Sequence, residues 1–157
     1  MFIFSVLVGQ RHSDVVRITK DNFIDDTFIC TQQKTGNKVR FKWNDYAFDL
    51  KIARALFRKY DYTCPYPVSI SVYNRSLHEL FRAIGQEFDT IITTEEKILG
   101  EIHVTSEPRW KTICSHTARR TAISFWANKG MNMNKLRKFS GHKDLRSLQE
   151  YMLEEEE

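Results

Sequence analysis

The sequence predicts a mixed α/β (α+β) protein that is mainly helical and contains a small antiparallel β-sheet. Apolar residues recur at helical spacing over most of the 157 residues, which indicates several amphipathic helices. One stretch, residues 38–43, instead alternates strictly between basic and apolar side chains, as a half-buried strand does. The turn-forming residues 34–37 (KTGN) separate it from a β-rich segment at 27–33. Together these patterns predict a hairpin within a helical protein.

The first helix is expected to start at the N-terminus, to break near Gly9 and to resume over 13–17. The hairpin then places three apolar side chains on one face of its second strand, and three basic side chains, Lys38, Arg40 and Lys42, on the other. A helix over 48–60 follows, with Phe48, Ile52, Leu56 and Tyr60 at four-residue spacing. We expect the segment CPYP, residues 64–67, to stop any helix before it.

The second half of the chain predicts more helices and one further hairpin. A helix is expected over about 73–87 and a hairpin over 90–105. Three helices are expected to close the chain, at about 116–128, 133–140 and 144–153. Gly130 and Gly141 stand where C-terminal helix caps are expected. The chain shows no repeat or linker, which favours a single domain over 1–153, followed by the acidic tail 154–157.

The charge balance favours a polyanionic partner. The formal net charge is +4, from 24 basic and 20 acidic residues, and it becomes +8 without the four terminal glutamates. The three cysteines show no CxxC spacing, which favours reduced thiols in the cytoplasm. No histidine pair has zinc-finger spacing. The apolar start MFIFSVLV is too short to cross a bilayer. We therefore expect no metal, no cofactor and no membrane partner.

Several residues have both an ordinary and a chemical interpretation. His116 and Arg119 are three apart at a helix start, which suits either a solvated basic turn or a phosphate-binding site. Arg11 follows the glycine break and either lies exposed in a loop or points inward, where Asp14 could hold it. Lys34 at the hairpin tip either keeps the surface soluble or reaches into a neighbouring groove. Tyr151 lies nine residues after His142 and suits either core filling or nucleophilic chemistry.

The order of these residues resembles the catalytic domain of the tyrosine recombinases, the phage-integrase family. GQRHSDVVRI is similar to the first arginine box, TQQKTGNKV to the lysine hairpin, and SHTARRTAISF with SGHKDLRSLQEY to the second box. The resemblance is strongest to integrases of mobile elements in Bacteroides-like bacteria and covers residues 2–152. The chain departs from the usual pattern at Val8, Gln10, His12 and Ser140, none of which is a catalytic position.

The resemblance implies a site made of Arg11, Lys34, His116, Arg119, His142 and Tyr151. Two guanidiniums suit the non-bridging oxygens of a phosphodiester because they hold their charge and bind in a fork geometry. His142 would add a hydrogen bond to the same phosphate, His116 would exchange the Tyr151 proton, and Lys34 would protonate the leaving 5′ oxygen. Tyr151 would form a covalent 3′-phosphotyrosyl intermediate. Further contacts to DNA are expected from the basic residues Lys38, Arg40, Lys42, Arg120 and Lys143.

The resemblance also implies double-stranded DNA as the partner, a tetramer on DNA for the full-length protein, and a bacterial, nucleoid-associated location in the cytoplasm. An N-terminal DNA-clamping domain is expected to be absent from this chain, which would then be monomeric. Three alternatives stay open at this point. They are a type IB topoisomerase with similar chemistry, a non-catalytic DNA-binding module, and a basic globule that binds RNA or protein.

Overall fold

The computed structural model describes the backbone of residues 1–153 and the side chains of residues 1–149. The chain divides into two compact units, one made of residues 1–68 with the residues from 116 onward, the other of residues 69–115. None of the helices in the described residues combines the length and apolar character that a membrane span requires. Each unit is described below by itself.

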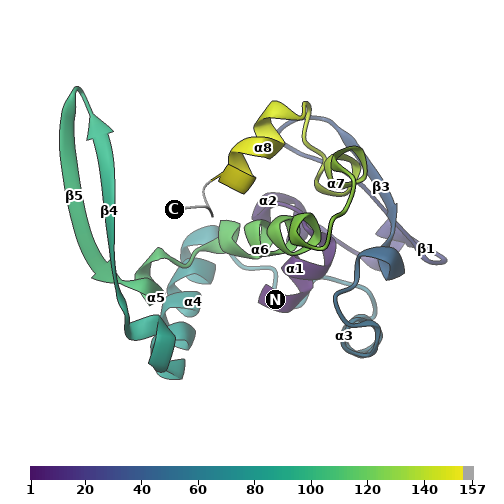
Figure 1. The fold of residues 1–157 in the computed structure, drawn as a ribbon. Coiled ribbons are helices and arrows are strands. Elements are labelled where there is room, and N and C mark those ends of the chain that lie inside the picture. The colour runs from purple at the N-terminus through teal and green to yellow at the C-terminus, as the bar shows by residue number, and fades with distance from the viewer. Residues whose placement is uncertain (154–157) are drawn as a thin grey trace. The chain divides into compact units, whose positions relative to one another are not determined.

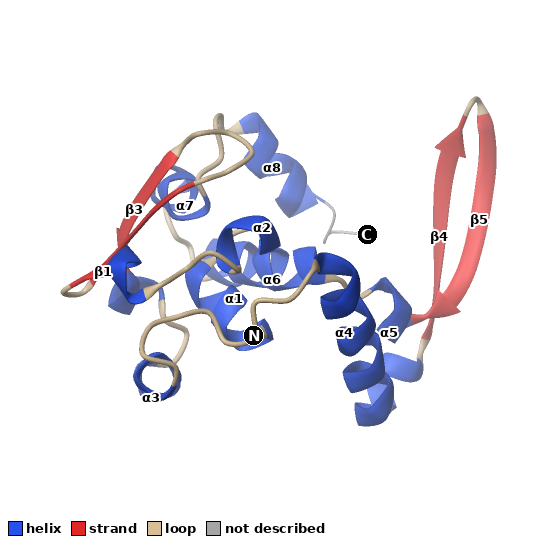
Figure 2. Cartoon of the chain, turned by 180° about the vertical axis from the view of Figure 1, so that it is seen from behind, coloured by secondary structure: helices blue, strands red, loops and turns tan. Residues whose placement is uncertain are grey.

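The first unit contains most of the helices and a three-stranded antiparallel sheet (Figure 1). Its strands are β1 (Phe23–Ile24), β2 (Thr27–Thr31) and β3 (Lys38–Lys42), in that order across the sheet. Its helices are α1 (Phe2–Val8), α2 (His12–Val15), α3 (Leu50–Lys59), α6 (Ser115–Asn128), α7 (Met133–Ser140) and α8 (Arg146–Leu153). Short 3-10 helices cover Lys20–Asn22 and Trp43–Tyr46. Figure 2 shows that helices and loops dominate this unit and that its strands form one small sheet.

The predicted hairpin is confirmed, including its alternation. β2 and β3 pair antiparallel with Phe28 opposite Phe41 and Cys30 opposite Val39. Val39 and Phe41 are buried, whereas the basic residues between and beside them are exposed. Helix α7 packs against β3, so the sheet is buried on its apolar face and leaves its basic face to solvent.

Aromatic side chains fill the core of the first unit. Phe4 and Phe57 meet edge to face at 5.4 Å, and Tyr46 stacks on Phe139 at 4.7 Å between ring centroids. Helix α3 therefore buries the face that carries Ala53 and Phe57, not the one expected from the sequence. Ile52 is 48% exposed. The four-residue spacing that begins at Phe48 was the wrong register, because the one large ring on the other face, Phe57, fits between Phe4 and Trp43.

The second unit contains helix α4 (Ile70–Ile84), a 3-10 helix (Gln86–Asp89), the hairpin β4 (Ile91–Ile98) and β5 (Glu101–Pro108), and the short helix α5 (Arg109–Thr112). The sequence placed α4 about three residues too late. The helix starts after Ser69, whose hydroxyl accepts a hydrogen bond from the Val72 N–H, and it ends at Gly85. The second hairpin is confirmed, with both strands exposed along most of their length.

Candidate active site

Arg119 is the central charged residue of the candidate site. It lies on α6 and is fully buried, with an exposed fraction of 0%. Its Nη1 donates a hydrogen bond to the carbonyl oxygen of Gly9 at 2.9 Å. Gly9 ends α1 in a left-handed conformation (φ 62°), and a Cβ at this position would overlap the ring of Phe139. The glycine break predicted from sequence therefore supplies an acceptor for a buried guanidinium.

His142 lies beside Arg119 and follows a second left-handed glycine, Gly141, which ends α7. Its Nε2 is 3.3 Å from Nη2 of Arg119, and its Nδ1 is 2.7 Å from the hydroxyl oxygen of Ser140. The side chain is buried, with 8% of its surface exposed. Ser140 is thus one of the residues that holds the imidazole, although it departs from the family pattern in the sequence.

The surroundings of His142 favour its neutral form. Its pKa is lowered from 6.5 to about 4, first by burial and then by the positive charges of Arg119 and Arg11. His116 adds a smaller effect of the same sign, and Asp144 opposes it. Three of the predicted site residues therefore lie near enough to His142 to lower its pKa, namely Arg11, His116 and Arg119.

Arg11 begins α2 and is half-buried. Its Nη1 donates to Oε1 of Gln32 at 3.3 Å, so the arginine does point inward. The expected contact with Asp14 is wrong: one carboxylate oxygen of Asp14 accepts from the backbone N–H of Gln33 at 2.7 Å, and the other has no hydrogen-bond partner among the described residues. Asp14 thus binds the end of the hairpin at Gln33. Gln32, not Asp14, is the residue that accepts a hydrogen bond from Arg11.

Two buried glutamines in this region were not identified from the sequence. Gln10 and Gln32 are each 1% exposed, and Gln32 Nε2 donates to Gln10 Oε1 at 2.8 Å. In the sequence, Gln10 was identified only as a departure from the usual family pattern. Gln32 and Gln33 are adjacent polar residues in a β-rich segment. Nothing in the sequence indicates that Gln32 is buried and Gln33 is exposed.

Lys34, His116 and the residues expected to contact DNA lie on exposed or partly exposed positions. Lys34 is exposed in the turn between β2 and β3, and His116 is partly buried in the first turn of α6. The residues expected to contact DNA, Lys38, Arg40, Lys42, Arg120 and Lys143, are all exposed. Tyr151 belongs to α8, but its side chain is outside the described part of the structure, as is the acidic tail 154–157.

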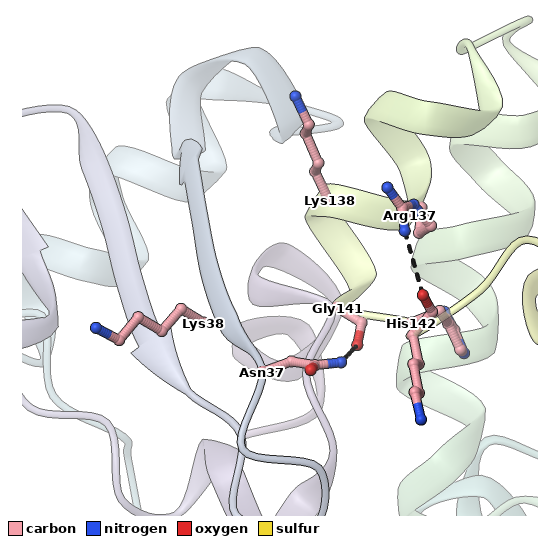
Figure 3. A pocket seen from close by; sticks show the side chains of 7 residues that line it. Asn37, Lys38, Arg137, Lys138, Gly141 and His142 are labelled. Atoms are coloured by element: carbon pink, nitrogen blue, oxygen red, sulfur yellow. Dashed lines mark hydrogen bonds between the residues drawn. The ribbon is translucent and has the colours of Figure 1, made fainter.

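A basic pocket of about 240 Å³ adjoins His142. It is lined by Asn37, Lys38, Arg137, Lys138, Gly141, His142 and Lys143. Figure 3 shows Asn37 reaching the carbonyl oxygen of Gly141, a hydrogen bond of 3.2 Å, while Lys38 and Lys138 point away from that contact. Arg137 Nη1 donates to the carbonyl of Lys143 at 3.2 Å, and its buried Nε has no hydrogen-bond partner among the described residues. The pocket therefore offers donors and positive charge without a carboxylate in its lining.

Metal ligands do not gather in the described residues, where no group of three His, Cys, Asp or Glu side chains could hold an ion. The three cysteines are free, and Cys30 and Cys64 are buried. Burial raises the pKa of the Cys30 thiol to about 12, so this thiol stays protonated beside the site.

Comparison with known proteins identifies a solved structure with a similar fold. No protein-family model matches the sequence, and no curated protein matches it. Among solved structures, the chain is similar to the Tn1549 transposon integrase in complex with a circular intermediate DNA, with a TM-score of 0.59 and 15% sequence identity. The alignment covers 96% of this chain and 52% of that chain, so the present chain spans about half the length of the integrase structure.

The similarity extends over nearly all of both units and includes the mainly helical architecture with small antiparallel sheets. The fold class predicted from the sequence is therefore confirmed. The chain has the fold of a transposon integrase, which agrees with the tyrosine recombinase resemblance of its sequence.

Proposed function

We propose that this chain is the catalytic domain of a site-specific DNA recombinase that cleaves and rejoins DNA strands through a 3′-phosphotyrosyl intermediate. The observation that carries the proposal is the fully buried Arg119, held by the Gly9 carbonyl and the His142 imidazole, with Arg11 close enough to lower the pKa of the same imidazole. The integrase fold supports the same function.

Burial of the Arg119 guanidinium is costly for folding. Removing a charge from water costs several kcal/mol unless an opposite charge or good hydrogen bonds compensate. The Gly9 carbonyl and the His142 imidazole supply two hydrogen bonds that hold the guanidinium in place. Buried charged groups are typical of functional sites. A phosphodiester bound at Arg11 and Arg119 would place negative charge beside both guanidiniums.

The proposed chemistry needs no group outside this chain and its DNA substrate. The Tyr151 oxygen attacks the phosphorus and forms a new P–O bond, while the bond from phosphorus to the 5′ oxygen breaks. His116 takes the phenol proton, and Lys34 gives a proton to the leaving 5′ oxygen. Arg11 and Arg119 stabilise the charge that accumulates on the non-bridging oxygens. Rejoining reverses each transfer, so the bond energy is kept in the phosphotyrosine.

A bound phosphate would change the electrostatics of His142. In the free protein its pKa is low because it is buried and because both arginines carry positive charge. A bound phosphate anion would offset those positive charges and shift the pKa of His142 upward. A phosphate at this position would then favour a proton on the imidazole and a hydrogen bond from the ring to a phosphate oxygen.

The basic surface beside the site suits the rest of the DNA backbone. The exposed face of β3 carries Lys38, Arg40 and Lys42, and the pocket next to His142 adds Arg137, Lys138 and Lys143. Phosphate contacts of this kind position a duplex without reading its sequence. As the resemblance implies, we extend the proposal to a tetramer on the DNA of a bacterial nucleoid for the longer protein.

Covalent trapping tests the proposed function. A nicked suicide duplex loses the short cleaved strand, so the protein–DNA adduct accumulates and is counted on a denaturing gel. Wild type should form the adduct, Tyr151→Phe should form none, and both should bind the duplex with similar affinity. Tyr66→Phe is the matched control, because Tyr66 is 71% exposed and should trap DNA as wild type does. An undiminished adduct from Tyr151→Phe would overturn the proposal.

A further inference from the structure

The side-chain amide of Gln32 joins three segments that the sequence keeps far apart. Its Nε2 donates to Gln10 Oε1 at 2.8 Å and to the Ser140 carbonyl at 2.9 Å. Its Oε1 accepts from Arg11 Nη1 at 3.3 Å and from the Thr35 hydroxyl at 2.8 Å. Both donors and both acceptors of the amide are therefore used, and the side chain is buried.

The orientation of this amide follows from its partners. Arginine has only donors, so the atom that faces Arg11 must be the oxygen, and the nitrogen must face the Ser140 carbonyl. Gln10 continues the network, because its Nε2 donates to the carbonyls of Val8 and Phe139 at 3.0 Å and 2.9 Å. A buried network whose members are all satisfied specifies one arrangement, since any other leaves a polar group unpaired.

We propose that Gln32 is a positioning residue for DNA cleavage. It holds the Arg11 guanidinium and the turn that carries Lys34 in a fixed place relative to the Gly141–His142 turn. The chemistry of this inference rests on the proposed function, but its geometry does not. Lys34 precedes Thr35, whose hydroxyl is bound to Gln32, so the amide acts on the proton donor through the turn and on the phosphate clamp directly.

The close packing of the hairpin end against Gly141 supports the positioning role of Gln32. A Cβ at Gly141 would overlap the Gln32 amide and Val39. Asn37, at the other end of the turn, donates to the Gly141 carbonyl at 3.2 Å. The hairpin end is thus attached to the Ser140–His142 segment at two points, one on each side of Lys34.

A substrate with sulfur in place of the bridging 5′ oxygen distinguishes a variant that misplaces the proton donor from a variant that is misfolded. A leaving thiolate needs no proton, because thiols are far more acidic than alcohols. Thr35→Val removes two hydrogen bonds of an exposed turn, one donated to Gln32 at 2.8 Å and one accepted from the Asn37 N–H at 3.4 Å. It should disturb the turn that carries Lys34 while Arg11 stays bound to Gln32. We expect it to slow cleavage of ordinary DNA by on the order of 10- to 100-fold and to cleave the sulfur substrate within about 2-fold of wild type.

Gln32→Met keeps the length of the side chain and removes all four hydrogen bonds. It should slow both substrates, because Arg11 is released as well, but the sulfur substrate less. Gln33→Met is the matched control, since Gln33 is exposed and adjacent, and it should match wild type. Rates are compared per folded molecule, measured by circular dichroism. Equal slowing of the two substrates by both Thr35→Val and Gln32→Met would mean a structural role only and would overturn the inference.

NMR of the arginine side chains tests the geometry without catalysis. In wild type the Arg11 guanidinium signals should be resolved and slow to exchange, and in Gln32→Met they should resemble those of the exposed Arg17. Arg11 signals unchanged in Gln32→Met would overturn the positioning role whatever the activity. A wild-type chain that shows the ordered Arg11 but cleaves neither substrate would overturn the proposed function instead and leave the geometry supported.

Discussion

Nε2 of His142 lies 3.3 Å from Nη2 of Arg119, and this contact determines where the imidazole carries its proton. A guanidinium can only donate, so Nε2 must be the acceptor and the proton must lie on Nδ1. Nδ1 then donates to the Ser140 oxygen at 2.7 Å, and the Ser140 hydroxyl donates to the carbonyl of Leu136 at 2.8 Å. The free site therefore holds a neutral His142 that supports Arg119.

The protonation of His142 predicts how stability depends on pH. The folded chain keeps His142 neutral down to a pKa of about 4, whereas the unfolded chain protonates it near 6.5. Between these values the unfolded state binds more protons, so stability is full above pH 6.5 and is lost as the pH falls toward 4. This loss, on the order of 3 kcal/mol, should be absent from His142→Gln in urea unfolding measured at several pH values.

The exposed His103 provides the control for that measurement. His103→Gln should keep the wild-type pH dependence, because His103 is an exposed residue of β5 in the second unit. A His142→Gln variant whose stability falls with acid as steeply as that of wild type would contradict the assignment.

Two glycines with the same backbone conformation predict different costs of substitution. Gly141 and Gly36 have φ values of 69° and 68°. A Cβ added at Gly141 would overlap Gln32 and Val39, whereas a Cβ added at Gly36 would lie in open space. Gly36→Ala should cost about 1 kcal/mol for the left-handed backbone alone. Gly141→Ala should cost a further 1–3 kcal/mol, roughly, for overpacking. Equal free energies of unfolding in the two variants would contradict the close packing of the hairpin against Gly141.

Local patterns were sufficient to predict the hairpins, the closing helices and the glycine break at Gly9. Each depends on residues that are neighbours in the chain, such as the alternation before Trp43 or a glycine after an apolar run. The register of α3 was not predictable this way, because Ile52 and Phe57 are equally apolar and only Phe4 and Trp43, from other elements, decide which is buried. Propensity alone cannot settle such a choice.

Some residues of the candidate site could likewise be identified from the sequence, and others only from the structure. Arg11 and Arg119 were identified through a resemblance of motifs, and the structure places both near His142. Gln10 and Gln32 were missed because their partners lie more than 100 residues away, at Phe139 and Ser140. A buried glutamine has the same composition signal as an exposed one, so only the assembled fold distinguishes Gln32 from Gln33.

Lys34 provides a test of the proton donor. Lys34→Ala should lose on the order of 100- to 10,000-fold in cleavage rate on ordinary DNA, as expected for loss of a general acid. The variant should cleave the 5′-sulfur substrate at close to the wild-type rate, whereas Arg119→Ala should fail on both substrates. If Lys34→Ala cleaves ordinary DNA normally, Lys34 is a turn residue and Lys38 becomes the candidate donor.

The basic pocket predicts the salt dependence of DNA binding. Counterion release makes the affinity fall steeply with salt, and each lost phosphate contact should flatten the log–log slope by roughly one. Arg137→Gln, Lys138→Gln and Lys143→Gln should each show this change in fluorescence-anisotropy titrations. Lys20→Gln is the control, because Lys20 lies 4.0 Å from Asp61 in an exposed ion pair. Slopes identical to that of wild type in all three pocket variants would exclude the pocket from the DNA interface.

The central claim is that Tyr151 becomes covalently attached to the 3′ end of a cleaved DNA strand. The most direct measurement isolates the adduct formed on a nicked suicide duplex, digests protein and DNA, and identifies the joined peptide and nucleotide by mass spectrometry. The account predicts a 3′-phosphate linked to the peptide that contains Tyr151. A phosphate linked through a 5′ end, or attached to Tyr46, Tyr60, Tyr62, Tyr66 or Tyr73, would contradict it.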